Sequence, residues 1–367
     1  MVSRRFALAA LGVAAALGLV PATAGAVPFN PSDFDLISPN PVSGHFAVDT
    51  DALTFGGFSG EERDGVAVFA LAGGSGLGNL TVTGSRPLAI LFQGLGGVMG
   101  TIDISGGDGM DEPAPGFGGP GGQGVAGGFH GGGGGVFSPG ADGGGPGGGE
   151  GENSIGGGIA NFGGAGGGFG GRGGNSGGIG TAQGGDPYGD LALALTGGSG
   201  GGGGGGKCCF ATDGGALEIG ANGLLVLLGA IIDASGGDGG PGLQGGGGGS
   251  GGGVLLHGFS VVLSSDAFID VSGGDGAKFG GCGGGGRVHI ETNTGGVSIN
   301  AGLINTSAGF GCFDTIHEGI VSGASSDQMG LALAQASASI PEPGGAAVFG
   351  LGLAGVFAAG RRRTAKR

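Results

Sequence analysis

The sequence predicts an all-β fold, a parallel β-helix (β-solenoid) with about three short strands in each coil. The first observation is a nine-residue element that occurs four times: TIDISGGDG from Thr101, IIDASGGDG from Ile231, FIDVSGGDG from Phe268 and, in altered form, LINTSAGFG from Leu303. The second is its spacing, because the equivalent residues Asp233, Asp270 and Asn305 lie 37 and 35 residues apart. A period in this range is typical of stacked repeats.

The third observation is that two strand-like runs precede each of the last three copies. The runs cover residues 216–219 and 224–228, 254–257 and 260–263, and 288–291 and 297–299. Short runs rich in Val, Ile and Leu and bounded by Gly, Asn, Asp and Ser indicate strands, and none is long enough for a helix. Each coil buries its apolar side only by stacking on the next. In the element itself, Ile232, Ile269 and Ile304 share one face, so that Asp233 and Asp270 point the other way, into solvent.

Residues 1–26 resemble a secretory signal in composition. They contain the parts of such a signal in order: Arg4 and Arg5, the apolar run 6–20, and the small residues Ala24, Gly25 and Ala26 at the cleavage site. We expect a signal helix here, which signal peptidase removes after Ala26. Residues 27–65 should then form an N-terminal cap, since the end coils of solenoids are atypical.

A glycine-rich, low-complexity segment, residues 106–206, divides the first coils (66–105) from the main coils (207–335). It has almost no β-branched residues, and such a segment cannot offset its ordering entropy by burying apolar surface. We therefore expect a large loop pushed out of the stack, with the coil that ends at Ser105 next to the coil that starts near Ala216. A bundle of polyproline-II-like glycine helices is the rival interpretation, but the sequence shows no three-residue period.

The C-terminal segment, residues 340–367, has three parts in a fixed order. They are Pro341, Glu342 and Pro343, an apolar run 344–360, and a basic cluster 361–367 that begins with Arg361, Arg362 and Arg363. The apolar run spans about 25 Å as a helix, the short limit for crossing a membrane. The basic cluster marks its cytoplasmic end.

This order is similar to the PEP-CTERM sorting signal of Gram-negative bacteria. The resemblance implies recognition by an exosortase, removal of the tail, and release or attachment at the cell surface. It also implies export across the inner membrane, a transient anchor through the C-terminal helix, and association with extracellular polysaccharide and biofilm. An ordinary membrane anchor would have the same topology without the processing.

Composition excludes several classes. Glycine accounts for 110 of the 367 residues but shows no G-X-Y register, and proline is only 15, which excludes collagen. Between residues 33 and 342 there are 28 acidic and 6 basic residues, a net charge of −22. This charge disfavours nucleic acid as a partner.

The four cysteines lie in glycine-rich stretches of a chain expected in a compartment that permits disulfides. Cys282 and Cys312 occur at nearly the same phase of neighbouring repeats, which predicts a bridge between them. Cys208 and Cys209 then pair with each other or stay free. Zinc is disfavoured because no C-x-x-C spacing occurs. His257 and His289 fall inside strands, and we expect both histidines to be surface residues that stack on their neighbours in adjacent coils.

The SGGDG turns suggest calcium, with Asp233, Asp238, Asp270 and Asp275 as the candidate ligands. Calcium requires six to eight oxygens. Two carboxylates one rung apart repel by only ~1 kcal/mol in water, so a solvated ladder needs no metal, and these residues are weak candidates. No cofactor is expected.

No residue is predicted to be catalytic. Tryptophan is absent, Tyr188 is the lone tyrosine, and the cations nearest the repeats, Lys278 and Arg287, lie beside loops. The sequence favours a non-enzymatic structural or adhesive protein of the cell surface or extracellular polysaccharide matrix. The alternative is a carbohydrate-binding or carbohydrate-active β-helix, which predicts a carboxylate cluster on one face of the solenoid.

Overall fold

The computed structural model describes most of the chain between residues 28 and 323. The described residues are 28–37, 44–109, 121–135, 139–152, 163–204, 211–240, 245–293, 297–299, 303–312, 314 and 318–323. The predicted signal (1–26), the sorting segment (340–367), Cys208 and Cys209 lie outside the described residues.

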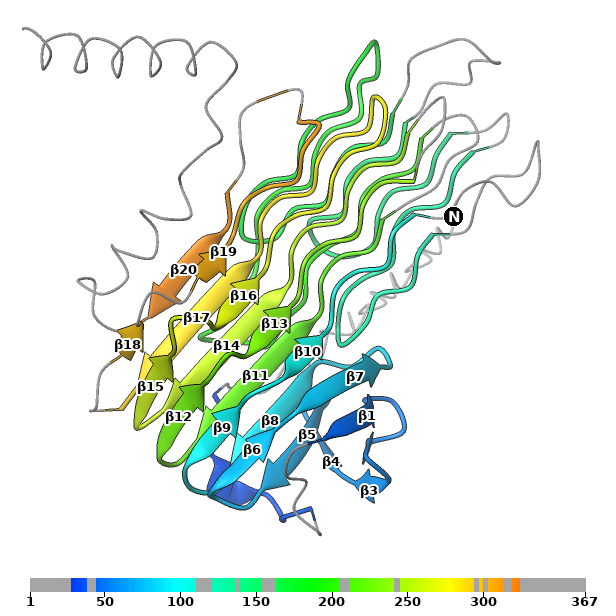
Figure 1. Ribbon diagram of the computed structural model, residues 1–367. Coiled ribbons are helices and arrows are strands. Elements are labelled where there is room, and N and C mark those ends of the chain that lie inside the picture. Colours follow the sequence, from blue (N-terminus) through cyan, green and yellow to red (C-terminus); the bar gives the residue numbers. More distant parts are fainter. Residues whose placement is uncertain are drawn as a thin grey trace, which may run out of the picture.

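Three sheets run side by side along the molecule (Figure 1). The seven-stranded sheet has the order β20 (Ile320–Gly323), β17 (Arg287–Thr292), β14 (Gly253–Gly258), β11 (Ala216–Ala221), β8 (Leu88–Phe92), β5 (Val66–Leu71), β4 (Glu61–Arg63). The five-stranded sheet has the order β18 (Val297–Ile299), β15 (Ser260–Leu263), β12 (Leu224–Leu227), β9 (Gly96–Val98), β6 (Ser75–Leu77). The eight-stranded sheet has the order β19 (Leu303–Asn305), β16 (Phe268–Asp270), β13 (Ile231–Asp233), β10 (Thr101–Asp103), β7 (Asn79–Thr83), β1 (His45–Asp49), β2 (Thr54–Phe55), β3 (Phe58–Ser59).

Each coil supplies one parallel strand to each sheet, from β5, β6 and β7 in the first coil to β17, β18 and β19 in the fifth. Asp103, Asp233, Asp270 and Asn305 stand in register in one row. The column predicted from the repeat is therefore present, and the fold is a nearly all-β solenoid of parallel strands. β13 pairs with β10 and β11 with β8, so the coils on either side of the glycine-rich segment are neighbours, as predicted.

The interior of the coils is apolar, as the strand pattern predicts. The isoleucine of each copy of the repeat is at most 1% exposed: Ile102, Ile232, Ile269 and Ile304. At the N-terminal end, β1 pairs in parallel with β7 but antiparallel with β2, and β4 pairs antiparallel with β5. These antiparallel strands cover the side of the first coil that does not stack on the second coil.

The seven-stranded sheet is also covered on its outer face. Phe29 and Phe34 pack there, and Phe169, Leu191 and Leu195 from the glycine-rich segment belong to the same buried cluster. Strands buried on both faces have continuous apolar sequences instead of alternating ones. This explains why every residue of β5, β8, β11 and β14 is buried.

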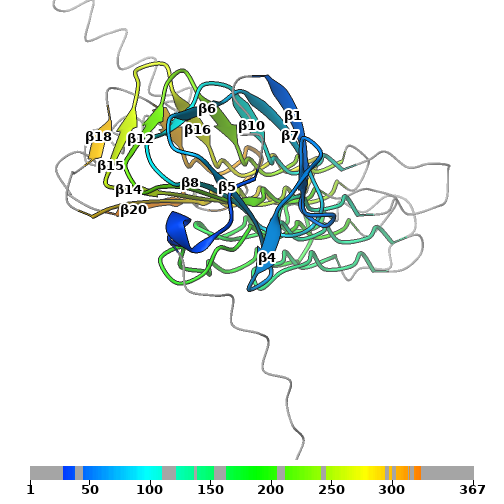
Figure 2. The same cartoon turned by 90° about the horizontal axis from the view of Figure 1, so that it is seen from below.

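The glycine-rich segment is not a loop pushed out of the stack, and this part of the fold prediction is wrong for the described residues. Its extended segments lie beside the glycine-rich connections of the coils, in layers that continue beyond the sheets (Figure 1, Figure 2). We call this region the glycine bundle: the described residues within 104–109, 121–215, 234–252, 271–286 and 305–312.

Backbone hydrogen bonds in the glycine bundle repeat every three residues. Residues 245–252 show the pattern: Gly245, Gly248 and Gly251 donate to Lys278, Gly281 and Gly284, Gly247 and Ser250 donate to Gly202 and Ser199, and Gly249 and Gly252 donate to Gly237 and Ala234. Three residues per turn without hydrogen bonds inside a segment is the geometry of a polyproline-II-like helix. The period is invisible in the sequence because glycine occupies nearly every position of the repeat.

Close packing is what restricts the glycine bundle to glycine. A Cβ on Gly167 would come within 3.0 Å of the carbonyl oxygens of Ser199 and Gly200. The bundle thus offsets its ordering entropy with hydrogen bonds between neighbouring segments and close backbone contact instead of apolar side chains.

Candidate functional site

The Asp-x-Ser pattern of the repeat is a local turn. The Asp233 carboxylate accepts hydrogen bonds from the backbone N–H of Ser235 at 3.0 Å and from its hydroxyl at 2.7 Å. Asp270 accepts the N–H of Ser272 at 2.9 Å and the amide of Asn305 at 3.1 Å. These bonds end the third strand of each coil and begin the extended segment that follows.

The other two calcium candidates form a second ladder. Asp238 accepts the backbone N–H of Asp275 at 2.8 Å, and Asp275 accepts that of Phe310 at 2.7 Å. Desolvation, together with the charges of Asp275 and Asp108, raises the pKa of Asp238. These carboxylates bind backbone donors of the next coil. Among the described residues, no group of three or more His, Cys, Asp or Glu is placed to hold a metal ion.

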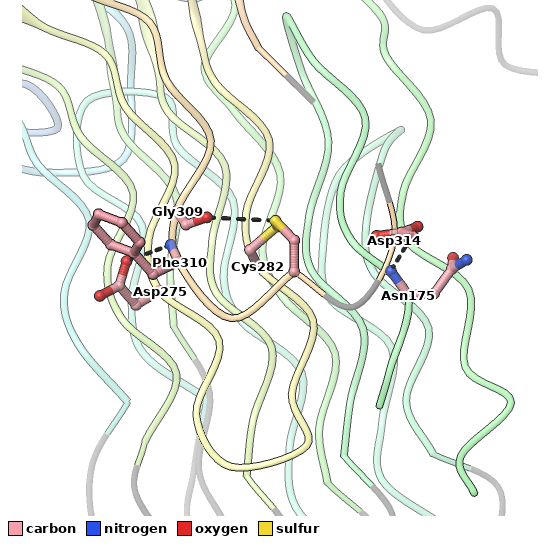
Figure 3. The surroundings of a disulfide bond; sticks show 7 residues. Asn175, Asp275, Cys282, Gly309, Phe310 and Asp314 are labelled. Atoms are coloured by element: carbon pink, nitrogen blue, oxygen red, sulfur yellow. Dashed lines mark hydrogen bonds between the residues drawn. A yellow bond between two sulfur atoms is a disulfide. The ribbon is translucent and has the colours of Figure 1, made fainter. Parts of the chain in front are cut away.

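Cys282 and Cys312 form the disulfide that their place in the repeat predicts, with Cα atoms 4.9 Å apart (Figure 3). Cys282 lies on the segment that returns to β17, and Cys312 lies beyond Gly309 and Phe310, on the segment that leaves β19. The bridge joins the last two repeats within the glycine bundle.

A buried carboxylate and a histidine meet on the outer face of the seven-stranded sheet. Glu218 on β11 is fully buried, and its Oε1 accepts a hydrogen bond from His257 Nε2 at 2.8 Å and from the backbone N–H of Phe29 at 2.7 Å. Its Oε2 has no hydrogen-bond partner. His257 is in register with Gly220, and its ring lies where a Cβ of Gly220 would be. Gly220 therefore leaves room for the imidazole to reach Glu218.

A pocket of about 220 Å³ opens beside this pair. Its polar lining consists of Asn30, Asn222, His257, Glu291 and Asn293, and Pro28, Phe29, Pro31, Ala221 and Gly258 complete it. Glu291 stands next to His257 because the two are in register on β14 and β17. Asn222 is fixed by a bond from its Nδ2 to Ser32 Oγ at 2.6 Å. A histidine, a carboxylate and amides line one cavity, which makes this pocket the candidate binding site.

The histidine prediction is wrong for His257, which is 7% exposed and paired with Glu218 instead of stacked on the surface. His289 is not its register neighbour, and its Nδ1 contacts Ser322 Oγ at 2.8 Å. Sequence reasoning missed Glu218 altogether. The signal available was a charged residue inside the otherwise apolar strand ALEIGA, because a buried charge is paired.

A second buried carboxylate, Asp213, lies in the glycine bundle just before β11. Its Oδ2 accepts the N–H of Phe129 at 2.8 Å, while its Oδ1 has no partner. Burial raises the pKa of Asp213 well above its usual value. The folded state therefore favours the protonated carboxyl group of Asp213. The stability gained in this way is present below the pKa that Asp213 has in the unfolded chain, and it is lost as the pH rises through the higher pKa of the folded state.

Replacing Asp213 with asparagine should remove this loss of stability at higher pH. We expect the melting temperature of Asp213→Asn to rise relative to the unmodified protein as the pH increases from 4 upward, because the amide does not ionise. Asp142→Asn serves as the control, since Asp142 also accepts a backbone N–H, that of Gly151, but lies at the surface. A difference for Asp213→Asn that stays constant with pH would contradict the assignment.

Comparisons with known proteins found no matching family model, no matching curated protein and no matching solved structure. Within the part of the chain that the structure describes, no helix is long and apolar enough to span a bilayer.

Proposed function

We propose that this chain is an exported structural or adhesive protein of the bacterial cell surface or extracellular polysaccharide matrix. The observation that carries the proposal is the disulfide between Cys282 and Cys312, because such bonds persist in oxidising compartments outside the cytosol. The architecture supports it as well. A solenoid joined to a hydrogen-bonded glycine bundle suits a rigid element that resists extension.

The sorting segment supplies the second part of the proposal. Its resemblance to a PEP-CTERM signal supports handling by an exosortase, after signal peptidase has acted near Ala26. The inner membrane would hold the chain only until the tail is removed. Surface attachment or release follows, and extracellular polysaccharide is the proposed neighbour there.

Changing Pro341, Glu342 and Pro343 together to alanine tests this route. We expect the variant to accumulate in the inner-membrane fraction with its C-terminal residues still present. The unmodified chain should instead appear outside that membrane, ending before residue 344. Mass spectrometry of both termini, with cell fractionation, measures each outcome.

A matched control is Pro113→Ala with Pro115→Ala, which removes prolines from the glycine-rich segment. These changes should leave processing intact. If the triple variant is processed and located like the unmodified chain, the sorting proposal fails and a plain membrane anchor takes its place.

One observation favours the second candidate, a carbohydrate-binding β-solenoid. Glu218 and Glu291 both stand on the outer face of the seven-stranded sheet, beside a pocket lined by three asparagines. Planar amides and carboxylates are the groups that hold sugar hydroxyls in fixed directions.

A further inference from the structure

We propose that the pocket beside Glu218 and His257 binds a primary ammonium group carried on a hydroxylated ring, as in an amino sugar. This inference rests on the carbohydrate-binding candidate and is independent of how the C-terminal segment is processed.

The first argument is charge. Glu291 lines the pocket, and no lysine or arginine is among its lining residues. Behind His257 lies the buried Glu218, one of whose carboxylate oxygens has no partner. Arg287, the cation of β17, donates instead to the carbonyl oxygens of Tyr188 at 2.8 Å and Phe169 at 3.3 Å. A positively charged ligand would therefore pair with carboxylates that have no lysine or arginine partner among the lining residues.

The second argument is the kind of hydrogen-bonding group that faces the pocket. The Nδ2 of Asn222 gives one of its two hydrogens to Ser32 Oγ, and its Oδ1 is an acceptor. His257 contacts Glu218 through Nε2, which leaves only Nδ1 of the ring for a ligand. The Glu291 carboxylate, which also lines the pocket, contributes acceptor oxygens. An ammonium group donates three hydrogen bonds and accepts none, which matches a set of acceptors.

The third argument is size. The pocket volume of about 220 Å³ corresponds to roughly seven waters of the liquid. This is room for one sugar ring inside the pocket. A terminal or free amino sugar is therefore the fitting occupant.

Calorimetric titration of the purified mature protein tests the proposal at low salt and near neutral pH. The probes are glucosamine, glucose and N-acetylglucosamine, which differ at one ring position by an ammonium, a hydroxyl or a neutral amide. Glucosamine should bind saturably and about tenfold or more tightly than either neutral sugar. A chitosan tetramer tests a polymer in the same titration. If each tetramer binds through one chain end with the affinity of glucosamine, the pocket holds a terminal unit. If every unit of the tetramer binds, the size argument is contradicted.

Two variants locate the site. Glu291→Gln should weaken glucosamine binding about tenfold while leaving glucose binding unchanged, because it removes only charge. Glu62→Gln, at an exposed glutamate of β4, is the matched control and should bind like the unmodified protein. The proposal is overturned if glucose binds as well as glucosamine, if Glu291→Gln has no effect, or if none of the sugars saturates. Such a failure leaves the sorting test unaffected.

Discussion

Replacing Gly248 with alanine is expected to lower the free energy of unfolding by roughly 3 kcal/mol or more, although only one methyl group is added. A Cβ at this position would lie within 3.0 Å of the carbonyl oxygen and carbon of Gly274 and of the nitrogen of Gly283. All three atoms belong to the backbone, so no flexible side chain can move aside. The segments on either side would have to separate, which breaks the hydrogen bond from Gly248 to Gly281.

Gly133→Ala is the matched control in the same glycine bundle. The nearest atom to a Cβ there is the side chain of Ala141, at 3.9 Å. This change should be neutral or slightly stabilising, by about 0.4–1 kcal/mol, because alanine has less conformational freedom in the unfolded chain. Urea denaturation of both variants measures the contrast. Equal midpoints would mean that the segments are not packed as closely as we describe.

The solenoid could be predicted because its information lies in side chains. Ile232, Ile269 and Ile304 repeat at a fixed spacing and are buried at a fixed place, so the period of the sequence is the period of the fold. The disulfide followed from the same reasoning, since equivalent positions in neighbouring repeats are adjacent in space. Each of these predictions needed only the register.

The glycine bundle could not be predicted in the same way. Its three-residue period is carried by backbone hydrogen bonds from residues such as Gly247 and Gly249, and every backbone has the same donors and acceptors. The compositional rule for disorder assumes that apolar side chains must drive ordering. In this bundle close backbone contact replaces them, which a rule based on side chains does not detect.

The pocket depends on partners far apart in the sequence. Glu218 meets the N–H of Phe29, 189 residues away, and His257 from the next coil. The coil register places Glu218 and His257 on adjacent strands, and that part was within reach of the sequence. The course of residues 28–37 across the sheet was not, because no repeat constrains a terminal segment.

Removing the disulfide with the double change Cys282→Ala and Cys312→Ala should lower the free energy of unfolding by about 3–4 kcal/mol. The bridge closes a loop with a sequence separation of 30 residues, and the estimate follows from the loop-closure entropy that the unfolded chain regains. The effect should be greatest in the last coils. Amide hydrogen exchange at Gly309, which donates to Gly283, and at Gly276, which donates to Phe310, should accelerate.

Exchange at Gly252, which donates to Ala234 one coil earlier, is the internal reference and should change least. Dithiothreitol should reproduce the loss of stability in the unmodified protein and add nothing in the double variant, because the bond it would reduce is already absent. If the double variant is as stable as the unmodified protein, the bridge is not what fastens the last coil to the stack. The interlocked backbone hydrogen bonds of the glycine bundle would then be sufficient by themselves.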